Sequence, residues 1–159
     1  MMNTQHADQM PTCYLDDHSA SSATFEERLE RSLGTEPIIY KELSYAIVGA
    51  AIEVHRRIGP GMIEGVYQRA LALMLRHRRI PFVAQAPLIV RFMETNVGEF
   101  FADFIIDDKI IVEIKSVERY SAVHRSQLFS YLGAAGLHLG MLINFNVPVL
   151  VRSVCRVIR

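Results

Sequence analysis

The sequence predicts an α/β fold of the α+β kind, in which a central mixed β-sheet carries helices on both faces. Apolar residues recur every three to four positions over 39–58, 62–77 and 121–135, which is typical of amphipathic helices. Shorter apolar runs lie between and after them, and the order strand, helix, strand over 110–145 predicts a right-handed crossover between parallel strands. Layers of helices on a sheet then follow as the way to bury these apolar faces.

Charge divides the chain into two parts. Residues 1–36 hold seven acidic and two basic residues and little apolar periodicity, so we expect a mostly disordered extension with a short helix near 25–33. Residues 37–159 hold ten acidic and fifteen basic residues, and we expect them to form one compact domain. Its modest positive charge is compatible with a polyanionic partner without requiring one.

Several classes of protein are disfavoured. No basic region followed by an apolar run opens the chain, which argues against a signal peptide, and polar residues interrupt the apolar stretch at 136–151. We therefore expect no membrane association. Cys13 and Cys155 are too widely separated to suggest a zinc site or a disulfide framework. Together these features predict a cytoplasmic protein.

Two helices are expected before the sheet. The first ends at Gly59-Pro60-Gly61, a strong stop signal, and the second covers residues 62–77. The residues expected to face inward are Leu43, Ile47, Ala50, Ala51, Val54 and Ile58 in the first helix, and Ile63, Val66, Ala70, Leu73 and Met74 in the second.

The strands are expected next. Two short strands are predicted at 82–85 and 88–92, followed by a turn over METNVG at 93–98. One strand is predicted at 139–145 and a last one over 149–158.

The hairpin FFADFIIDDKIIVEIK, residues 100–115, is the stretch richest in possible chemistry. A three-residue loop at 107–109 gives one uniformly apolar side, whereas a two-residue loop would mix charges into both sides. The apolar side pairs Ile106 with Ile110, Phe104 with Val112 and Ala102 with Ile114; the other side pairs Ile105 with Ile111, Asp103 with Glu113 and Phe101 with Lys115.

This register places two carboxylates opposite each other. Like charges on paired strands are unfavourable by roughly 0.2–1 kcal/mol, so a compensating positive charge is expected, and a metal ion is one candidate. Hard cations such as Mg²⁺ use oxygen ligands, commonly one or two carboxylates. Lys115 projects to the same side as Glu113, where an ammonium suits phosphodiester hydrolysis.

Other polar residues lie close by in the predicted fold. Along the third helix, His124, Gln127 and Tyr131 form a polar stripe that is expected to overhang the charged side of the hairpin. Glu64 opens the second helix, where a carboxylate favours the helix dipole. Each has a simpler interpretation: a solvated helix face, a surface ion pair between Glu113 and Lys115, or a helix-end carboxylate. His124 has no second ligand at metal spacing.

Several of these segments resemble a known family. GMIEGVY at 61–67 matches its Gly-x-x-Glu-x-x-Tyr signature, and VGAAIEVHRRIGPG, ADFIIDDKIIVEIKSVE, HRSQLFSYL and LGMLINF add further matches. From about Ile39 to the C-terminus the chain resembles the GxxExxY family, which is placed in the PD-(D/E)xK nuclease superfamily. The resemblance implies a restriction-endonuclease-like fold over residues 37–159.

The resemblance also implies roles for individual residues. Asp103 corresponds to the motif aspartate, Glu113-Ile114-Lys115 to the Glu-x-Lys motif and Glu64 to the carboxylate of the preceding helix. Asp103, Glu113 and Glu64, with the Ile114 carbonyl, are the expected ligands of Mg²⁺ or Mn²⁺, and Lys115 acts on the attacking water. Gln127 and Tyr131 resemble a Gln-x-x-x-Tyr motif. Ala102 stands where the family pattern has proline.

Two functions follow from these observations. The first is a Mg²⁺- or Mn²⁺-dependent nuclease acting on nucleic acid, DNA in preference to RNA. The alternative is a catalytically inactive nucleic-acid-binding or scaffold module that keeps the nuclease-like fold. The oligomeric state is open, and a homodimer is one option.

Overall fold

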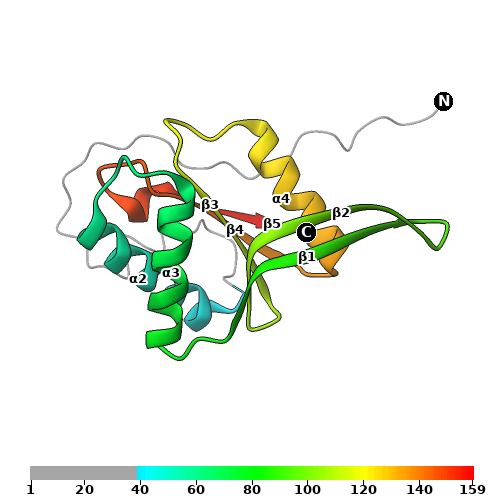
Figure 1. Ribbon diagram of the computed structural model, residues 1–159, viewed down its shortest axis with the longest axis horizontal. Helices are drawn as coiled ribbons and strands as arrows, with labels where there is room; N and C mark the ends of the chain where they lie inside the picture. Colours follow the sequence, from blue (N-terminus) through cyan, green and yellow to red (C-terminus); the bar gives the residue numbers. More distant parts are fainter. Residues whose placement is uncertain (1–38) are drawn as a thin grey trace.

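The computed structural model describes residues 39–159, so the predictions for residues 1–36 lie outside the described residues. A five-stranded sheet forms the centre of the fold (Figure 1). The elements, in chain order, are α2 (Lys41–Ile58), α3 (Glu64–His77), β1 (Phe82–Phe92), β2 (Thr95–Ile106), β3 (Ile110–Lys115), α4 (Ala122–Ala135), β4 (Leu139–Asn144), the 3₁₀ turn η1 (Leu150–Ser153) and β5 (Val154–Ile158).

The sheet is mixed, as predicted. Its strands lie in the order β1-β2-β3-β4-β5. β3 and β4 pair in parallel, while the other three neighbouring pairs are antiparallel. The connection between the two parallel strands runs through α4, as the strand, helix, strand order of the sequence predicted.

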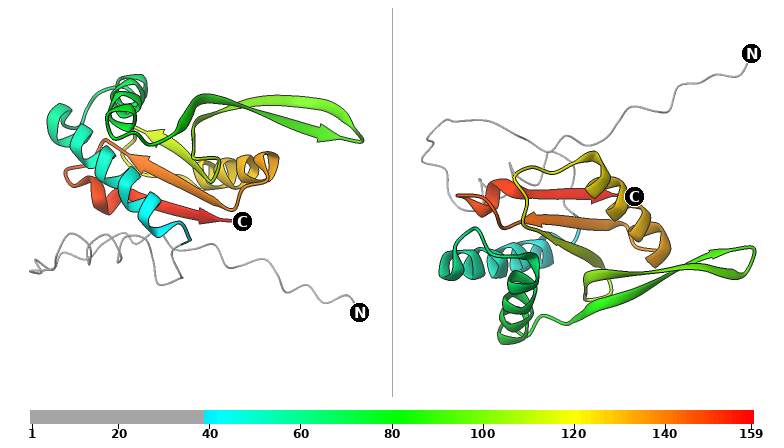
Figure 2. Two further views of the ribbon diagram at one scale, coloured as in Figure 1. Left: turned by 90° about the horizontal axis from the view of Figure 1, so that it is seen from below. Right: turned by 45° about the horizontal axis from the view of Figure 1, so that its top comes forward.

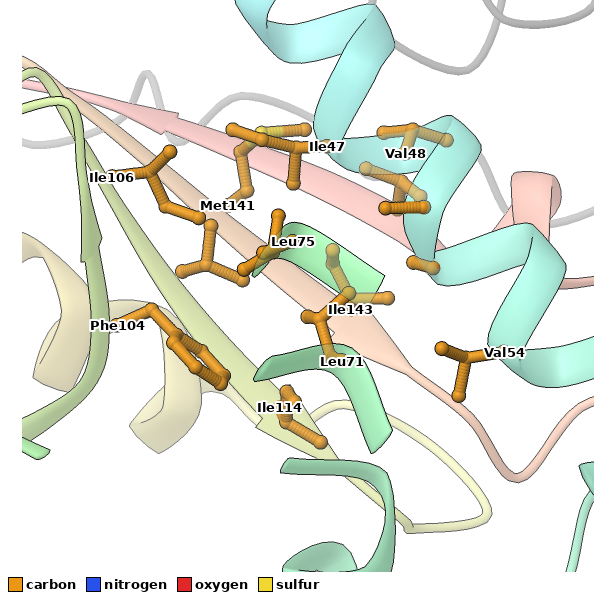
Figure 3. Packing of buried hydrophobic residues seen from close by; sticks show 14 of the residues in the cluster. Ile47, Val48, Val54, Leu71, Leu75, Phe104, Ile106, Ile114, Met141 and Ile143 are labelled. Atoms are coloured by element: carbon orange, nitrogen blue, oxygen red, sulfur yellow. The ribbon is translucent and has the colours of Figure 1, made fainter. Parts of the chain in front are cut away.

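Two apolar clusters cover opposite faces of this sheet. α2 and α3 pack with one face, where Phe104, Ile114 and Ile143 meet Leu71 and other helix residues (Figure 3). α4 packs on the other face, on the far side of the sheet from α2 and α3 (Figure 2). Strand β3 is buried on both faces, which explains its almost continuous apolar sequence.

The two helices on the first face were predicted with unequal success. In α2 the expected stripe, including Ile47 and Val54, is buried, and the helix ends at Gly59 with φ of 78°. In α3 the predicted stripe is correct for Ala70 and Met74, which pack against the core, but wrong for Ile63 and Leu73, which are exposed. The buried residues of α3 are Tyr67, Leu71 and Leu75. Apolar residues are so frequent in α3 that two overlapping stripes fit the helical period.

The ends of the sheet differ from the predicted strands. Residues 82–92 form one strand instead of two, since Pro87 lies on an edge strand and needs no hydrogen-bonded N–H there. The turn after β1 contains only Met93 and Glu94, both with positive φ, so β2 starts at Thr95. The predicted last strand is shorter, because Leu150–Ser153 is a 3₁₀ turn.

One prediction of exclusion can be compared with the structure. None of the described helices is long and apolar enough to cross a membrane. Of the two cysteines, Cys155 is buried in β5, and position 13 lies outside the described residues.

Candidate active site

Strands β2 and β3 separate at Asp103. The predicted register is confirmed where Ile106 pairs with Ile110, Ile105 with Ile111 and Phe104 with Val112, and the ladder ends there. The predicted pairs of Asp103 with Glu113, Ala102 with Ile114 and Phe101 with Lys115 are therefore wrong as strand pairs.

Two features of β1 and α4 coincide with the separation. Gln85, in the part of β1 that faces Asp103, has a left-handed backbone with φ of 49°. Beyond that point, Ala102 packs with Leu88 against α4, whereas Ile114 stays in the cluster on the α2 and α3 face. β2 thus changes the face on which its apolar side chains are buried.

Hydrogen bonds to the two carboxylates take the place of the backbone hydrogen bonds that β2 and β3 lack beyond this point. The Asp103 N–H donates to Glu113 Oε1 at 3.1 Å, and the Ile114 N–H donates to Asp103 Oδ2 at 2.7 Å. Each side chain therefore satisfies a backbone donor of the opposite strand, a group that would cost free energy if it were buried without a partner. The separation of the strands brings both carboxylates into one gap.

Burial dominates the electrostatics of this gap. Glu113 is only 4% exposed. Burial, and after it the charge of Asp103, raises the pKa of Glu113 to about 7. Burial also raises the pKa of Asp103, although the hydrogen bond from Ile114 opposes this. Lys115 Nζ lies 3.5 Å from Glu113 Oε2, so one ammonium faces two carboxylates and the gap can accommodate a further cation.

This electrostatic arrangement predicts how stability depends on pH in metal-free solution. Because the pKa of Glu113 is about 7 in the folded protein and 4.5 ordinarily, the folded state binds more protons between these values. The free energy of unfolding should therefore fall as pH rises through this window, by up to ~3 kcal/mol. Urea denaturation in EDTA at several pH values measures this free energy of unfolding. Glu113→Gln should flatten the profile, and identical profiles for the two proteins would contradict the assignment.

Helix α3 adds contacts that the sequence analysis missed. The Gln68 amide donates to Asp103 Oδ1, and the Gln85 amide approaches the same oxygen at 3.5 Å. Glu64 Oε1 accepts the N–H of Ser116 at 3.2 Å, just after β3 ends. A signal for Gln68 was present, since it lies four residues after Glu64 and thus on the same face of α3. Nothing in the local sequence indicated Gln85 or Ser116.

The loop before α3 is held in place by Tyr67. Its hydroxyl donates to the Gly59 carbonyl at 2.7 Å and accepts the Met62 N–H at 3.1 Å. Ser116 Oγ in turn donates to the Met62 carbonyl at 2.6 Å. These bonds fix the start of α3 beside the end of β3, and so position Glu64.

Tyr67→Phe should therefore destabilise the fold although it keeps the buried ring. The lost hydroxyl leaves the Gly59 carbonyl and the Met62 N–H without this partner, which is expected to cost about 1–3 kcal/mol. Chemical denaturation measures the change. Tyr40→Phe, which changes an exposed ring just before α2, is the control for loss of a tyrosine hydroxyl away from this loop, and an equal cost in both variants would contradict the role given to Tyr67.

Helix α4 brings one of its predicted residues close to the gap. Burial, and then the charge of Glu113, raises the pKa of Tyr131, so the Tyr131 hydroxyl lies within the field of the carboxylates. Gln127 Nε2 donates to that hydroxyl at 2.9 Å and thereby orients it. His124 instead accepts the Ser121 N–H at 3.2 Å in a capping box, which confirms its interpretation as a structural residue.

The donors of the gap fit a divalent cation. Among residues 39–159, no group of three or more His, Cys, Asp and Glu side chains is placed to hold a metal, so the set that includes Glu64 remains a prediction. Two carboxylates suffice for Mg²⁺ when water completes its shell. Asp103 Oδ1 is approached by two amide donors, whereas Asp103 Oδ2 and the two Glu113 oxygens have one partner each, and a carboxylate oxygen with one partner has a further lone pair.

Comparison with known proteins gives one match. Comparison with curated proteins and comparison with solved structures each gave no match. A family model described as the PD-(D/E)XK nuclease superfamily matches residues 41–157, which include both carboxylates, Lys115 and the whole sheet except the last residue of β5. The match thus covers most of the chain, and the mixed sheet with flanking helices is consistent with a restriction-endonuclease-like fold. The chain belongs to the PD-(D/E)XK nuclease superfamily.

Proposed function

We propose that this protein is a divalent-metal-dependent nuclease that hydrolyses phosphodiester bonds, with DNA as the preferred substrate. One observation carries the proposal most strongly. Asp103 and Glu113 lie buried together where β2 and β3 separate, with Lys115 beside them, in a chain of a nuclease superfamily. Buried like charges are costly unless something compensates them, and a bound cation does so.

Asp103 and Glu113 are the proposed ligands of Mg²⁺ or Mn²⁺. Glu64 and the Ile114 carbonyl are further candidates, on elements that meet at the same end of β3. When bound, such an ion polarises a phosphoryl oxygen and makes a bound water more acidic. Gln68 donates to Asp103 and thus fixes the direction in which this carboxylate presents its oxygens.

The remaining side chains act on the substrate and the water. Lys115 has a side chain that is 13% exposed, so its ammonium is shielded from solvent and can orient the attacking water or stabilise negative charge on the phosphate. Tyr131, oriented by Gln127, is placed to position the phosphate backbone or the Lys115 ammonium.

A titration with Mn²⁺ tests the metal site, and a cleavage assay tests the chemistry. Mn²⁺ should raise the melting temperature of the wild type and leave Glu113→Ala unchanged, because a ligand that binds only the folded state stabilises it. Plasmid, single-stranded DNA and RNA should each be offered with Mg²⁺ and then Mn²⁺. Metal binding without cleavage of any substrate would favour the inactive binding module.

A further inference from the structure

A two-stranded arm projects from the body of the protein. β1 and β2 continue past α4 as an isolated ribbon, and both views in Figure 2 show its tip extending away from the helices. We call residues 87–101 the arm. Its inner face contacts α4, where Leu88 is buried and the Phe100 ring lies 5.9 Å from that of Tyr131.

The outer face and tip of the arm are apolar and exposed. Pro87, Ile89 and Phe101 share the outer face, because Pro87 pairs with Phe101 and Ile89 with Glu99. Phe101 is 52% exposed. At the tip, Phe92 is 62% and Met93 83% exposed. A two-stranded ribbon with solvent on one side is only marginally stable, so a partner that covers this face would stabilise it.

We propose that the outer face and tip of the arm form a dimer interface with the same surface of a second copy of this chain. The exposed apolar area corresponds to the apolar share of a standard interface. Five exposed apolar side chains at roughly 100 Å² each offer about 500 Å² per copy, against about 800 Å² per partner, polar rim included, in a standard interface. The five are Ile89, Phe92, Met93, Val97 and Phe101.

Charge favours a second copy over nucleic acid as the occupant. The arm carries Arg91 against Glu94 and Glu99, so a phosphate backbone would meet a net negative charge. In a two-fold arrangement each contact between different residues occurs twice, so the arginine of one arm can face an acidic residue of the other.

The distribution of exposed apolar residues favours contact between two arms. The other large exposed apolar residues of the described chain are dispersed over Val83 of β1, the ends of α2, α3, α4 and the region near the C-terminus. A head-to-tail contact would instead seat the arm in the pocket between α2 and α3, which Val54, Leu73 and Met74 help to line, and the Leu73→Asp variant below tests that alternative. A contact between two arms is isologous and closes at two copies. This inference is independent of the proposed nuclease activity.

Sedimentation equilibrium of the full chain tests the proposal. The wild type should be a dimer, and Ile89→Asp and Phe92→Asp should each raise the dimer dissociation constant about 30-fold or more, as for loss of a central contact. Leu73→Asp, on the exposed side of α3, is the matched control and should leave the constant unchanged. Circular dichroism should show that all three variants are folded.

Three results would overturn the proposal. They are a wild type that stays monomeric at high concentration, association that continues beyond two copies, and a dimer that Leu73→Asp weakens as much as the arm variants do. Glu113→Ala should remain dimeric, so a failure of this proposal is distinguishable from a failure of the nuclease proposal. Arm variants that lose nucleic-acid binding while the wild type is monomeric would identify the arm as a nucleic-acid contact instead.

Discussion

Lys115→Ala is expected to lower the rate of cleavage by about 100-fold or more while metal and nucleic acid still bind, as for loss of one preorganised charge. The ammonium lies 3.5 Å from Glu113 and is shielded from solvent. Its charge therefore acts with little screening on a developing negative charge, and it contributes no oxygen ligand to a metal. The rate constant at saturating substrate is the quantity to measure.

The pH of the cleavage assay determines whether a slower rate reflects loss of the Lys115 charge or loss of the metal. Removing Lys115 takes away a charge that lowers the pKa of Glu113, so at neutral pH the variant would lose metal by protonation. The comparison should therefore be made at about pH 8 or higher, where Glu113 is mostly ionised in the wild type. Metal affinity measured by calorimetry under the same conditions separates the two effects.

Matched variants make the result specific. Lys109→Ala removes a lysine from the turn between β2 and β3, where its partner is Asp107, and should cleave like the wild type. Glu113→Ala should lose both metal and cleavage. Cleavage that persists in Lys115→Ala and Glu113→Ala alike would show that the activity comes from another site or from a contaminating enzyme.

The sequence predicted those parts of the fold that depend on local pattern. The register from Ile106–Ile110 to Phe104–Val112 is correct, because a one-residue slip would move every side chain of the strand to the other face. The parallel pairing of β3 with β4 is also correct, since a helix connects them.

The separation of β2 from β3 was not predictable in the same way. It coincides with a left-handed backbone at Gln85 and with the packing of Ala102 against α4 instead of the α2 and α3 face. Both are contacts between segments far apart in the chain. The sequence therefore predicted correctly that Asp103 and Glu113 lie together, but the predicted reason, a cross-strand pair, is not the observed one. Each carboxylate instead accepts a hydrogen bond from a backbone N–H of the opposite strand.

The residues around the carboxylates were predicted unevenly. Tyr131 lies close to the carboxylates as expected, because it and Gln127 share one face of α4. Gln68 was missed although its spacing from Glu64 was visible, because the inward face of α3 was assigned to Ile63 and Leu73. The correct stripe of Tyr67, Leu71 and Leu75 turns Gln68 toward β2.

Asp103→Asn and Glu113→Gln should each weaken Mn²⁺ binding by more than ~100-fold. Loss of a residue that only supports a metal ligand costs up to ~100-fold in metal affinity, so a larger loss identifies the ligands themselves. Both changes remove a charged ligand from a site that has two. The same changes should leave the metal-free protein as stable as the wild type at about pH 8, or more stable, because a buried repulsion disappears. Calorimetry gives the affinity, and urea denaturation in EDTA gives the stability.

The hydrogen bonds explain why the amides are tolerated. In Asp103→Asn the side-chain oxygen can still accept the Ile114 N–H, and Gln68 can rotate its amide to accept from the new NH₂ group. In Glu113→Gln the oxygen can still accept the Asp103 N–H. Asp108→Asn, in the exposed turn of the same hairpin, is the control and should change neither quantity. Unchanged Mn²⁺ affinity in both site variants would place the metal elsewhere. A large loss of metal-free stability would instead show that the ionised carboxylates hold β2 and β3 together without a cation.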